Sequence, residues 1–286
     1  MSLSGQERKF EPVGRFVKKL VLPLGVVVLL MTLGVAVLFM VAGEPGKAGE
    51  TVAAREKAAS SLLIKAANLA HPRYVSDEQI ALYDEVVRRF GNDKSPGVRA
   101  QVAEALLSKG SALMRRYKAE EAIAIYDEVV RRFGNDSTDV RIMVANALFG
   151  KSVALYSTSG AQYSKKAIAI YDEIDHRFGK DKSPLIREKV ARAILYKGIH
   201  SESEEQIAVY DEVVRRFGND DSPWVREHAA QALSAKSDIL WSQGKTEEAI
   251  AIYEDIIRRF ERDFDRDKFY SSAVARAKSY LKELKR

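Results

Sequence analysis

The chain has 286 residues, of which 46% are hydrophobic and 30% are charged, so it has enough apolar material for a packed core. It contains no cysteine, which excludes disulfides, thiolate zinc sites and cysteine nucleophiles. Its net charge is +6, but residues 1–43 hold five basic and two acidic residues and so account for half of this surplus. The rest of the chain is nearly neutral, which gives little support to nucleic-acid binding.

One hydrophobic segment, residues 20–42, contains 23 residues without a charge. At about 1.5 Å per residue, a helix of this length measures roughly 34 Å, enough to cross a hydrocarbon core about 30 Å thick. A cleaved signal peptide is the alternative, because small residues follow the segment. The apolar region of a signal peptide is usually only about 7–15 residues long, however. The sequence therefore predicts a transmembrane helix that acts as an uncleaved signal anchor.

The charges on either side of this segment predict its orientation. Residues 1–19 form a basic N-terminal tail, whereas the first fifteen residues after the span carry three basic and three acidic residues. The positive-inside rule then places the N-terminus in the cytoplasm and the rest of the chain on the other side, which in a bacterium is the periplasm. Residues 43–50 are a linker. Phe10 and Phe16 would also suit contact of the tail with anionic lipid, although a plain topology signal explains the same charges.

The eleven residues YDEVVRRFGND occur three times without a change, at 83–93, 126–136 and 210–220. Counting the related strings that begin at Tyr171 and Tyr253, successive tyrosines are 39–45 residues apart. A period in this range is typical of a solenoid. Apolar residues recur at helical spacing in residues 120–133 and in the segment that precedes them, so each unit is predicted to be a pair of helices.

The repeated string itself predicts the end of one helix, a turn and the start of the next helix. Asp127 and Glu128 each lie four residues before an arginine, a spacing at which opposite charges meet on a helix surface. The carboxylates are therefore interpreted as structural rather than catalytic. The glycines that follow are expected to adopt the left-handed cap conformation, and the serine of each Ser-Pro pair is expected to cap the next helix. These residues are Gly91, Gly134, Gly179, Gly218, Ser95, Ser183 and Ser222.

The units resemble the tetratricopeptide repeat (TPR) family, in a bacterial-type variant with a long period and an N-terminal membrane anchor. In that family a small residue late in the first helix is followed by a tyrosine-like residue, and the second helix carries an alanine and an aromatic residue. The matching residues are Leu106, Gly110, Leu113, Ala122, Tyr126 and Val129 in one unit, and Leu233, Ser237, Leu240, Gly244, Ala249, Tyr253 and Ile256 in another. The likeness covers roughly residues 58–261. The period exceeds the family's value of about 34 residues, so the first helices are expected to be longer.

The resemblance implies an all-α fold, a right-handed solenoid of helical hairpins preceded by a single transmembrane helix. About five TPR-like repeats would occupy residues 51–266, and residues 267–286 would form a C-terminal capping helix. It also implies that partners bind the concave surface formed by the first helices. Some family members hold a C-terminal carboxylate there with Lys and Asn side chains. The matching residues here, Leu107, Ser111, Phe149, Val153, Ser234 and Asp238, do not supply that clamp.

Five large side chains of the first helices are candidates to line an apolar groove instead, suited to hydrophobic or aromatic anchors of a partner. They are Met114, Phe149, Tyr156, Tyr196 and Trp241. The alternative is that several of them pack between neighbouring repeats. The four histidines show no metal-ligand spacing, the glycines form no phosphate-binding loop, and no EF-hand is complete. The sequence thus predicts no enzyme, no cofactor and no bound metal.

The leading hypothesis is a scaffold or adaptor anchored in the inner membrane, with its repeats in the periplasm, that binds protein or peptide partners. Neither the partner nor the oligomeric state follows from the sequence. One alternative is a structural or assembly component that self-associates through the solenoid ends and the basic C-terminal helix. Another is a membrane-tethered peptide chaperone, which requires the reversed topology.

Overall fold

The computed structural model describes residues 50–284, except residues 72, 135, 137, 159–162 and 268–271. They belong to one compact unit that begins at Glu50. The predicted basic tail, the predicted span at 20–42 and most of the linker lie outside the described residues. In the part of the chain that is described, no helix is both long enough and apolar enough to cross a membrane.

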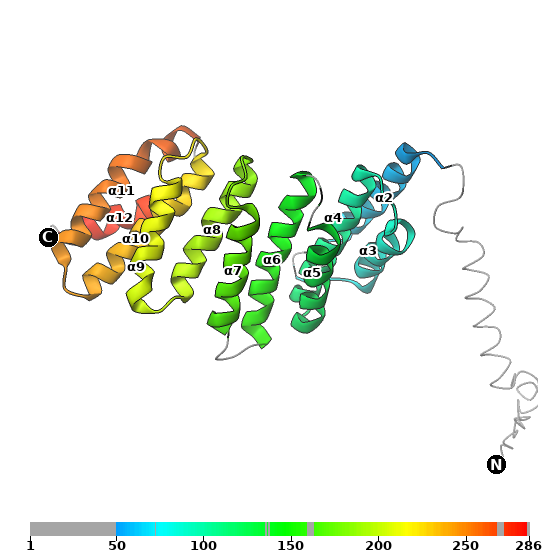
Figure 1. Ribbon diagram of the computed structural model, residues 1–286, viewed down its shortest axis with the longest axis horizontal. Helices are drawn as coiled ribbons and strands as arrows, with labels where there is room; N and C mark the ends of the chain where they lie inside the picture. Colours follow the sequence, from blue (N-terminus) through cyan, green and yellow to red (C-terminus); the bar gives the residue numbers. More distant parts are fainter. Residues whose placement is uncertain are drawn as a thin grey trace, which may run out of the picture. The chain divides into compact units, whose positions relative to one another are not determined.

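The described residues form eleven helices and no strand, which confirms the all-α prediction. In chain order the helices are α2 (Val52–Asn68), α3 (Asp77–Phe90), α4 (Pro96–Arg115), α5 (Ala119–Phe133), α6 (Thr138–Thr158), α7 (Tyr163–Phe178), α8 (Pro184–His200), α9 (Ser203–Phe217), α10 (Pro223–Ser242), α11 (Thr246–Asp267) and α12 (Ser272–Leu284). Successive pairs from α2/α3 to α10/α11 make five antiparallel hairpins, and α12 follows them (Figure 1).

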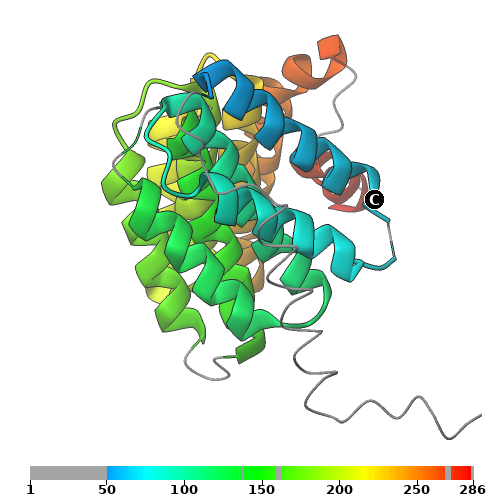
Figure 2. The same cartoon turned by 90° about the vertical axis from the view of Figure 1, so that its right-hand side faces the viewer.

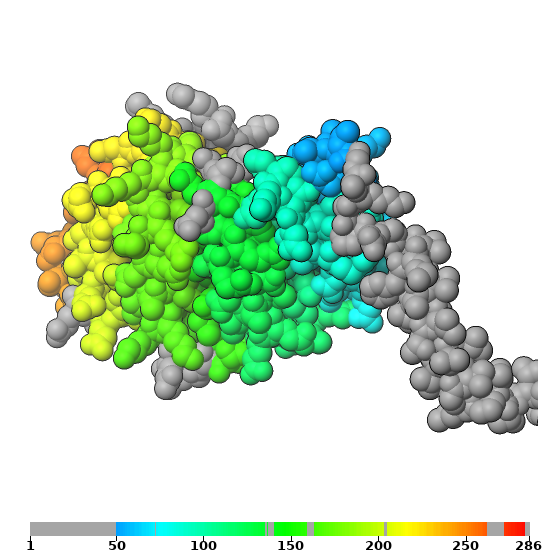
Figure 3. All heavy atoms as spheres, turned by 45° about the vertical axis from the view of Figure 1, so that its right-hand side comes forward, coloured from blue at the N-terminus to red at the C-terminus, as the bar shows by residue number. Residues whose placement is uncertain are grey.

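The hairpins stack in a row with two layers. Each first helix contacts the first helices of the neighbouring hairpins, as α4 does with α2 and α6. Each second helix packs against the first helix of its own hairpin and against that of the next. Seen from the end of the row, α2 and α3 lie in front of the other hairpins (Figure 2), and the space-filling view shows neighbouring hairpins in close contact (Figure 3). The first helices therefore share one continuous layer.

The tyrosine that opens each repeated string fills the space between first helices. All five of these tyrosines are buried. The ring of Tyr126 lies so close to Gly110 of its own hairpin and Gly150 of the next that a Cβ atom at either glycine would stand 2.5 or 2.4 Å from it. Glycine at these positions therefore allows the ring to touch the helix backbone, and burial of such an aromatic ring is a large part of the interface between hairpins.

The aspartate that ends each string organises the turn into the next helix. Its carboxylate accepts the backbone N–H of the serine two residues on, at 2.8–2.9 Å in three turns. It also pairs with an arginine from the first turns of the same hairpin's first helix, at 2.5–2.7 Å. These pairs are Arg55–Asp93, Arg99–Asp136, Arg141–Asp181 and Arg187–Asp220. Ser95, Ser183 and Ser222 are the N-cap residues, as predicted, and proline follows each of them in the first turn. Their side chains make no capping hydrogen bond, however, and the aspartate organises the turn instead.

Of the two ion pairs predicted within each second helix, the structure confirms the one made by the glutamate. The glutamate pairs with the arginine four residues later, as in Glu128–Arg132 at 2.8 Å. The aspartate before the glutamate was also predicted to pair with the arginine four residues after it, and that prediction is wrong. It accepts instead from a lysine of the next hairpin's first helix at 2.5–2.6 Å, because that lysine lies within reach once the hairpins stack. These pairs are Asp84–Lys109, Asp127–Lys151, Asp172–Lys197 and Asp211–Lys236.

The glycine of the string has a different purpose from the one predicted. Gly91, Gly134 and Gly218 have φ between −58° and −64°, which is right-handed, so the expected left-handed cap is wrong. A Cβ atom at Gly91 would lie 2.3 Å from the carbonyl oxygen of Val87 and 3.2 Å from Nη2 of Arg132. That arginine, from the next second helix, donates to the carbonyl of Gly91 at 2.5 Å. Glycine therefore leaves room for the neighbouring hairpin's arginine.

We predict that Gly110→Val lowers the free energy of unfolding by about 1–3 kcal/mol, because the new side chain would overlap the ring of Tyr126. Urea unfolding followed by circular dichroism measures the loss. Glu104→Val is the matched control, since Glu104 is exposed in the same helix, and it should stay within about 0.5 kcal/mol. Equal losses in the two variants would mean that a β-branched side chain in this helix, and not the ring contact, causes the effect.

We predict that Asp220→Asn destabilises the protein by about 1–3 kcal/mol at neutral pH, because Arg187 and the Ser222 N–H lose a charged acceptor. Burial opposes ionisation of Asp220, but the bonds from Arg187 and Ser222 outweigh it and hold the pKa of this carboxyl below its usual range. A lowered folded pKa gives stability that is present above about pH 5 and lost as the pH falls below about 4.

The difference in unfolding free energy between wild type and Asp220→Asn should therefore shrink between about pH 5 and about pH 2. Asp221→Asn, which changes an exposed neighbour, should leave stability nearly unchanged at every pH. A difference that stays constant over this whole range would contradict the assignment of the effect to the Asp220 charge.

Candidate functional site

Four apolar side chains are exposed on two adjoining first helices in the middle of the row. Val153 and Tyr156 lie one helical turn apart in α6, with 56% and 71% of their surface exposed. Tyr196 and Ile199 are placed in the same way in α8, with 40% and 50% exposed. We call these four residues the α6–α8 patch. Since α6 contacts α8 directly, the patch belongs to the shared layer of first helices.

The five predicted groove residues occupy three different environments. Tyr156 and Tyr196 are exposed and belong to the α6–α8 patch. Phe149 is 6% exposed and packs in the core between hairpins. Met114 of α4 and Trp241 of α10 are half-buried against the core, and the ring of Trp241 meets Tyr280 of α12 at 5.3 Å. The structure thus brings three of the five together around α6 and α8, and places the other two on the helices to either side.

A connected set of rings lies beneath and beside the patch. Phe149 contacts Tyr196 at 6.3 Å and Tyr171 at 5.9 Å between ring centroids. Tyr163, at the start of α7, lies edge-on to Tyr156 at 5.1 Å and to His200 at 4.9 Å. Aromatic pairs in such edge-to-face arrangements add about 0.5–1.5 kcal/mol beyond burial of their area. The exposed tyrosines are therefore held by packed neighbours, which reduces the ordering cost of binding.

Two titratable groups among these rings, His200 and Tyr171, are uncharged at neutral pH. Burial lowers the pKa of His200, so its imidazole is uncharged at neutral pH. Burial also raises the pKa of Tyr171, whose hydroxyl donates to the Ser152 hydroxyl at 3.4 Å. The guanidinium of Arg192 lies over the ring of Phe149 at 4.0 Å. The patch therefore suits an apolar or aromatic group, with one cation beside it.

Ile199, Tyr163 and His200 also lie at this surface, which was not predicted, and Val153 was predicted only to lack the charge of a carboxylate clamp. Ile199 and Val153 occupy the position that holds Ser111 and Asp238 in other hairpins. A comparison of the aligned copies would have shown that apolar residues replace polar ones at this position in two adjacent units. In the described part of the chain, no group of three acidic or histidine side chains is placed to hold a metal ion.

Comparison with known proteins supports the character of the repeats. A family model described as "Tetratricopeptide repeat" matches residues 77–137 and 204–264. No curated protein matches the sequence. The crystal structure of a thermophilic TPR protein from Thermus thermophilus is 17% identical, covers 76% of this chain and 99% of its own, and gives a TM-score of 0.36. Residues 77–137 and 204–264 of this all-α chain thus carry tetratricopeptide repeats, and the α6–α7 hairpin between them uses the same ion pairs.

Proposed function

We propose that this protein is a membrane-anchored scaffold that binds protein or peptide partners through the layer of its first helices. The observation that carries the proposal is the α6–α8 patch, four exposed apolar side chains on adjoining helices of a rigid stack. The matched TPR segments support it, because such repeats generally mediate contacts between proteins. No catalytic role is proposed for any residue.

Tyr156 and Tyr196 are the proposed anchors for a partner. Exposed aromatic side chains that are already held by neighbours lose little entropy on binding and are common among the residues that dominate binding energy. Phe149 supports Tyr196 from below rather than touching the partner. Met114 and Trp241 would extend the same surface to α4 and α10. A partner segment with two or three apolar side chains in a row fits this surface.

The membrane anchor is part of the proposal. Residues 20–42 form the transmembrane helix, the N-terminus is cytoplasmic and the repeats face the periplasm. The support for this lies in the uncharged length of the segment and in the basic residues before it. The predicted linker, residues 43–50, extended at roughly 3.5 Å per residue, would keep the repeats within about 30 Å of the bilayer surface.

We predict that a photoreactive amino acid at position 156 forms discrete cross-linked products with a partner in cells. Tyr196→Ala should lower their yield at least tenfold, because loss of one binding anchor typically costs about 2 kcal/mol or more. A photoreactive group at position 117 is the matched control, since Tyr117 is 97% exposed but lies in the turn between α4 and α5. Identical products from positions 156 and 117 would contradict the proposal.

We predict that a C-terminal fusion to a reporter active only in the periplasm is active, and that a fusion to one active only in the cytoplasm is not. The result follows from the excess of positive charge before residues 20–42. Deleting residues 20–42 should abolish the periplasmic signal. Activity of the cytoplasmic reporter in the full-length fusion would reverse the topology and make a tethered cytoplasmic chaperone the leading interpretation.

A further inference from the structure

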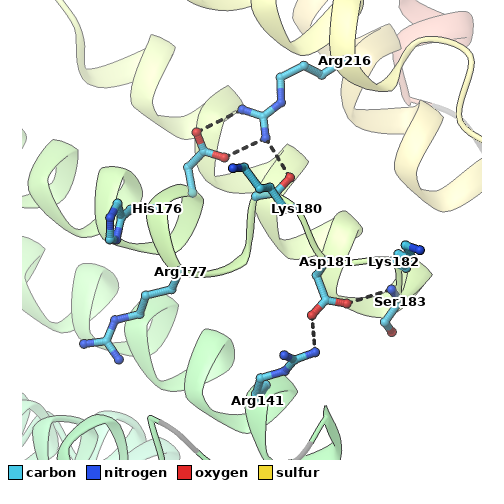
Figure 4. A pocket seen from close by; sticks show the side chains of 10 residues that line it. Arg141, His176, Arg177, Lys180, Asp181, Lys182, Ser183 and Arg216 are labelled. Carbon is cyan, nitrogen blue, oxygen red and sulfur yellow. Dashed lines mark hydrogen bonds and ion pairs between the residues drawn. The ribbon is translucent and has the colours of Figure 1, made fainter.

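A second surface of the row, at the turn between α7 and α8, contains a cavity of about 930 Å³. Side chains of α6, α7, the turn itself and α9 form its walls, and Arg141 and Arg216 approach the turn from opposite sides (Figure 4). Every lining residue is charged, polar or glycine. An apolar ligand therefore has no complementary wall in this cavity.

The cavity carries a surplus of positive charge. Its lining includes five lysines and arginines but only two aspartates. Both carboxylates are already neutralised, Asp181 by Arg141 and Asp175 by Arg216, which meets both oxygens of Asp175 at 2.7 and 3.0 Å. Lys180 and Lys182 are exposed, and neither forms an ion pair within the described residues. Nε of Arg141 is buried and has no hydrogen-bond partner there.

The other hairpins serve as an internal control for what stacking requires. Three of them, α2/α3, α4/α5 and α8/α9, have the same Arg–Asp pair and the same glycine but do not have both lysines. At the position of Lys180 they have asparagine, at that of Asp175 they have valine, and at that of Lys182 they have lysine, serine or aspartate. These residues are Asn92, Asn135, Asn219, Val87, Val130, Val214, Lys94, Ser137 and Asp221. The two lysines together are thus not needed to build the turn.

The hydrogen bonds of the turn's backbone indicate which class of anion the cavity can bind. A phosphoryl group is usually held by free backbone N–H groups. Here the N–H groups of Gly179, Asp181 and Ser183 are all bonded within the turn. Donors at the rim of this wide, open cavity include the flexible side chains of Lys180 and Lys182. Such donors match several carboxylates spread along a chain better than one compact phosphate.

We propose that this cavity binds an acidic segment of a partner protein, with Lys180 and Lys182 as the carboxylate contacts and Arg141 as a donor in the wall. Asp175 fixes Arg216 in the opposite wall through a bidentate ion pair, which makes that wall rigid and leaves the net positive charge of the cavity to the two lysines. The contacts are exposed ion pairs, which are weak singly and screened by salt. Binding therefore requires at least two carboxylates and falls as ionic strength rises. This site lies apart from the α6–α8 patch, so either can fail alone.

The test uses the full-length protein in a neutral detergent and a fluorescein-labelled hexaglutamate peptide, with binding followed by fluorescence anisotropy. Lys180→Asn combined with Lys182→Ser, both residues that other turns already contain, should weaken binding at least tenfold without changing the circular dichroism spectrum. Lys94→Ser removes the matching lysine of the first turn and is the control, for which binding should be unchanged. Hexaglutamine should not bind.

Three results would overturn the proposal. Failure of hexaglutamate to bind at low ionic strength would exclude an acidic peptide site. An equal loss with Lys94→Ser would show unspecific attraction to basic turns. Binding to phosphatidylglycerol vesicles or to inorganic phosphate that depends on Lys180 and Lys182, while hexaglutamate binding does not, would assign the cavity to a phosphoryl group. If a photoreactive group at position 156 forms no cross-links in cells, that result contradicts only the function proposed for the α6–α8 patch.

Discussion

The stack depends on an ion pair that closes four of the five hairpins, between an arginine early in the first helix and the aspartate in the turn after the second helix. In Arg187–Asp220 the contact is 2.7 Å long and the aspartate side chain is 9% exposed. The same carboxylate accepts the N–H of Ser222 and so starts the next helix. One side chain thereby fixes both the closure of its own hairpin and the direction of the following one. A charge that is nearly buried is tolerated because both contacts neutralise it.

The other residues of the repeated string make contacts between neighbouring hairpins. The tyrosine packs against first helices on both sides, the first aspartate reaches the lysine of the next hairpin, and the second arginine reaches back to the preceding glycine carbonyl. Arg132 combines this last contact with a bond to Glu128 and lies over the ring of Phe133 at 5.3 Å. Almost every position of the string is therefore used, which explains why three copies are identical.

Helices and period could be predicted from the sequence because apolar spacing and repetition are local properties of the chain. The ion-pair partners of charged residues could not be predicted in the same way. Asp127 could pair with Arg131 of its own helix or with Lys151, and only the stacking of hairpins brings Lys151 into contact. The right-handed φ of Gly91 has the same cause, since the constraint comes from Arg132 of another hairpin. Among the large residues of the first helices, exposure separates Tyr156 from Phe149, and the burial of Phe149 depends on neighbours such as Arg192 and Tyr171, which the sequence alone does not reveal.

The identity of the copies also makes the hairpins interchangeable. Tyr83 begins the same string as Tyr126, so a chain without residues 84–126 would keep the string intact and would place Asp127 beside Lys151 as before. Each hairpin contacts only its neighbours, so no distant contact would be broken. Recombination between the gene segments that encode this string would therefore shorten or lengthen the row in whole units. The length of the solenoid would then evolve in steps of one hairpin, and each new junction would have the contacts that the present ones already have.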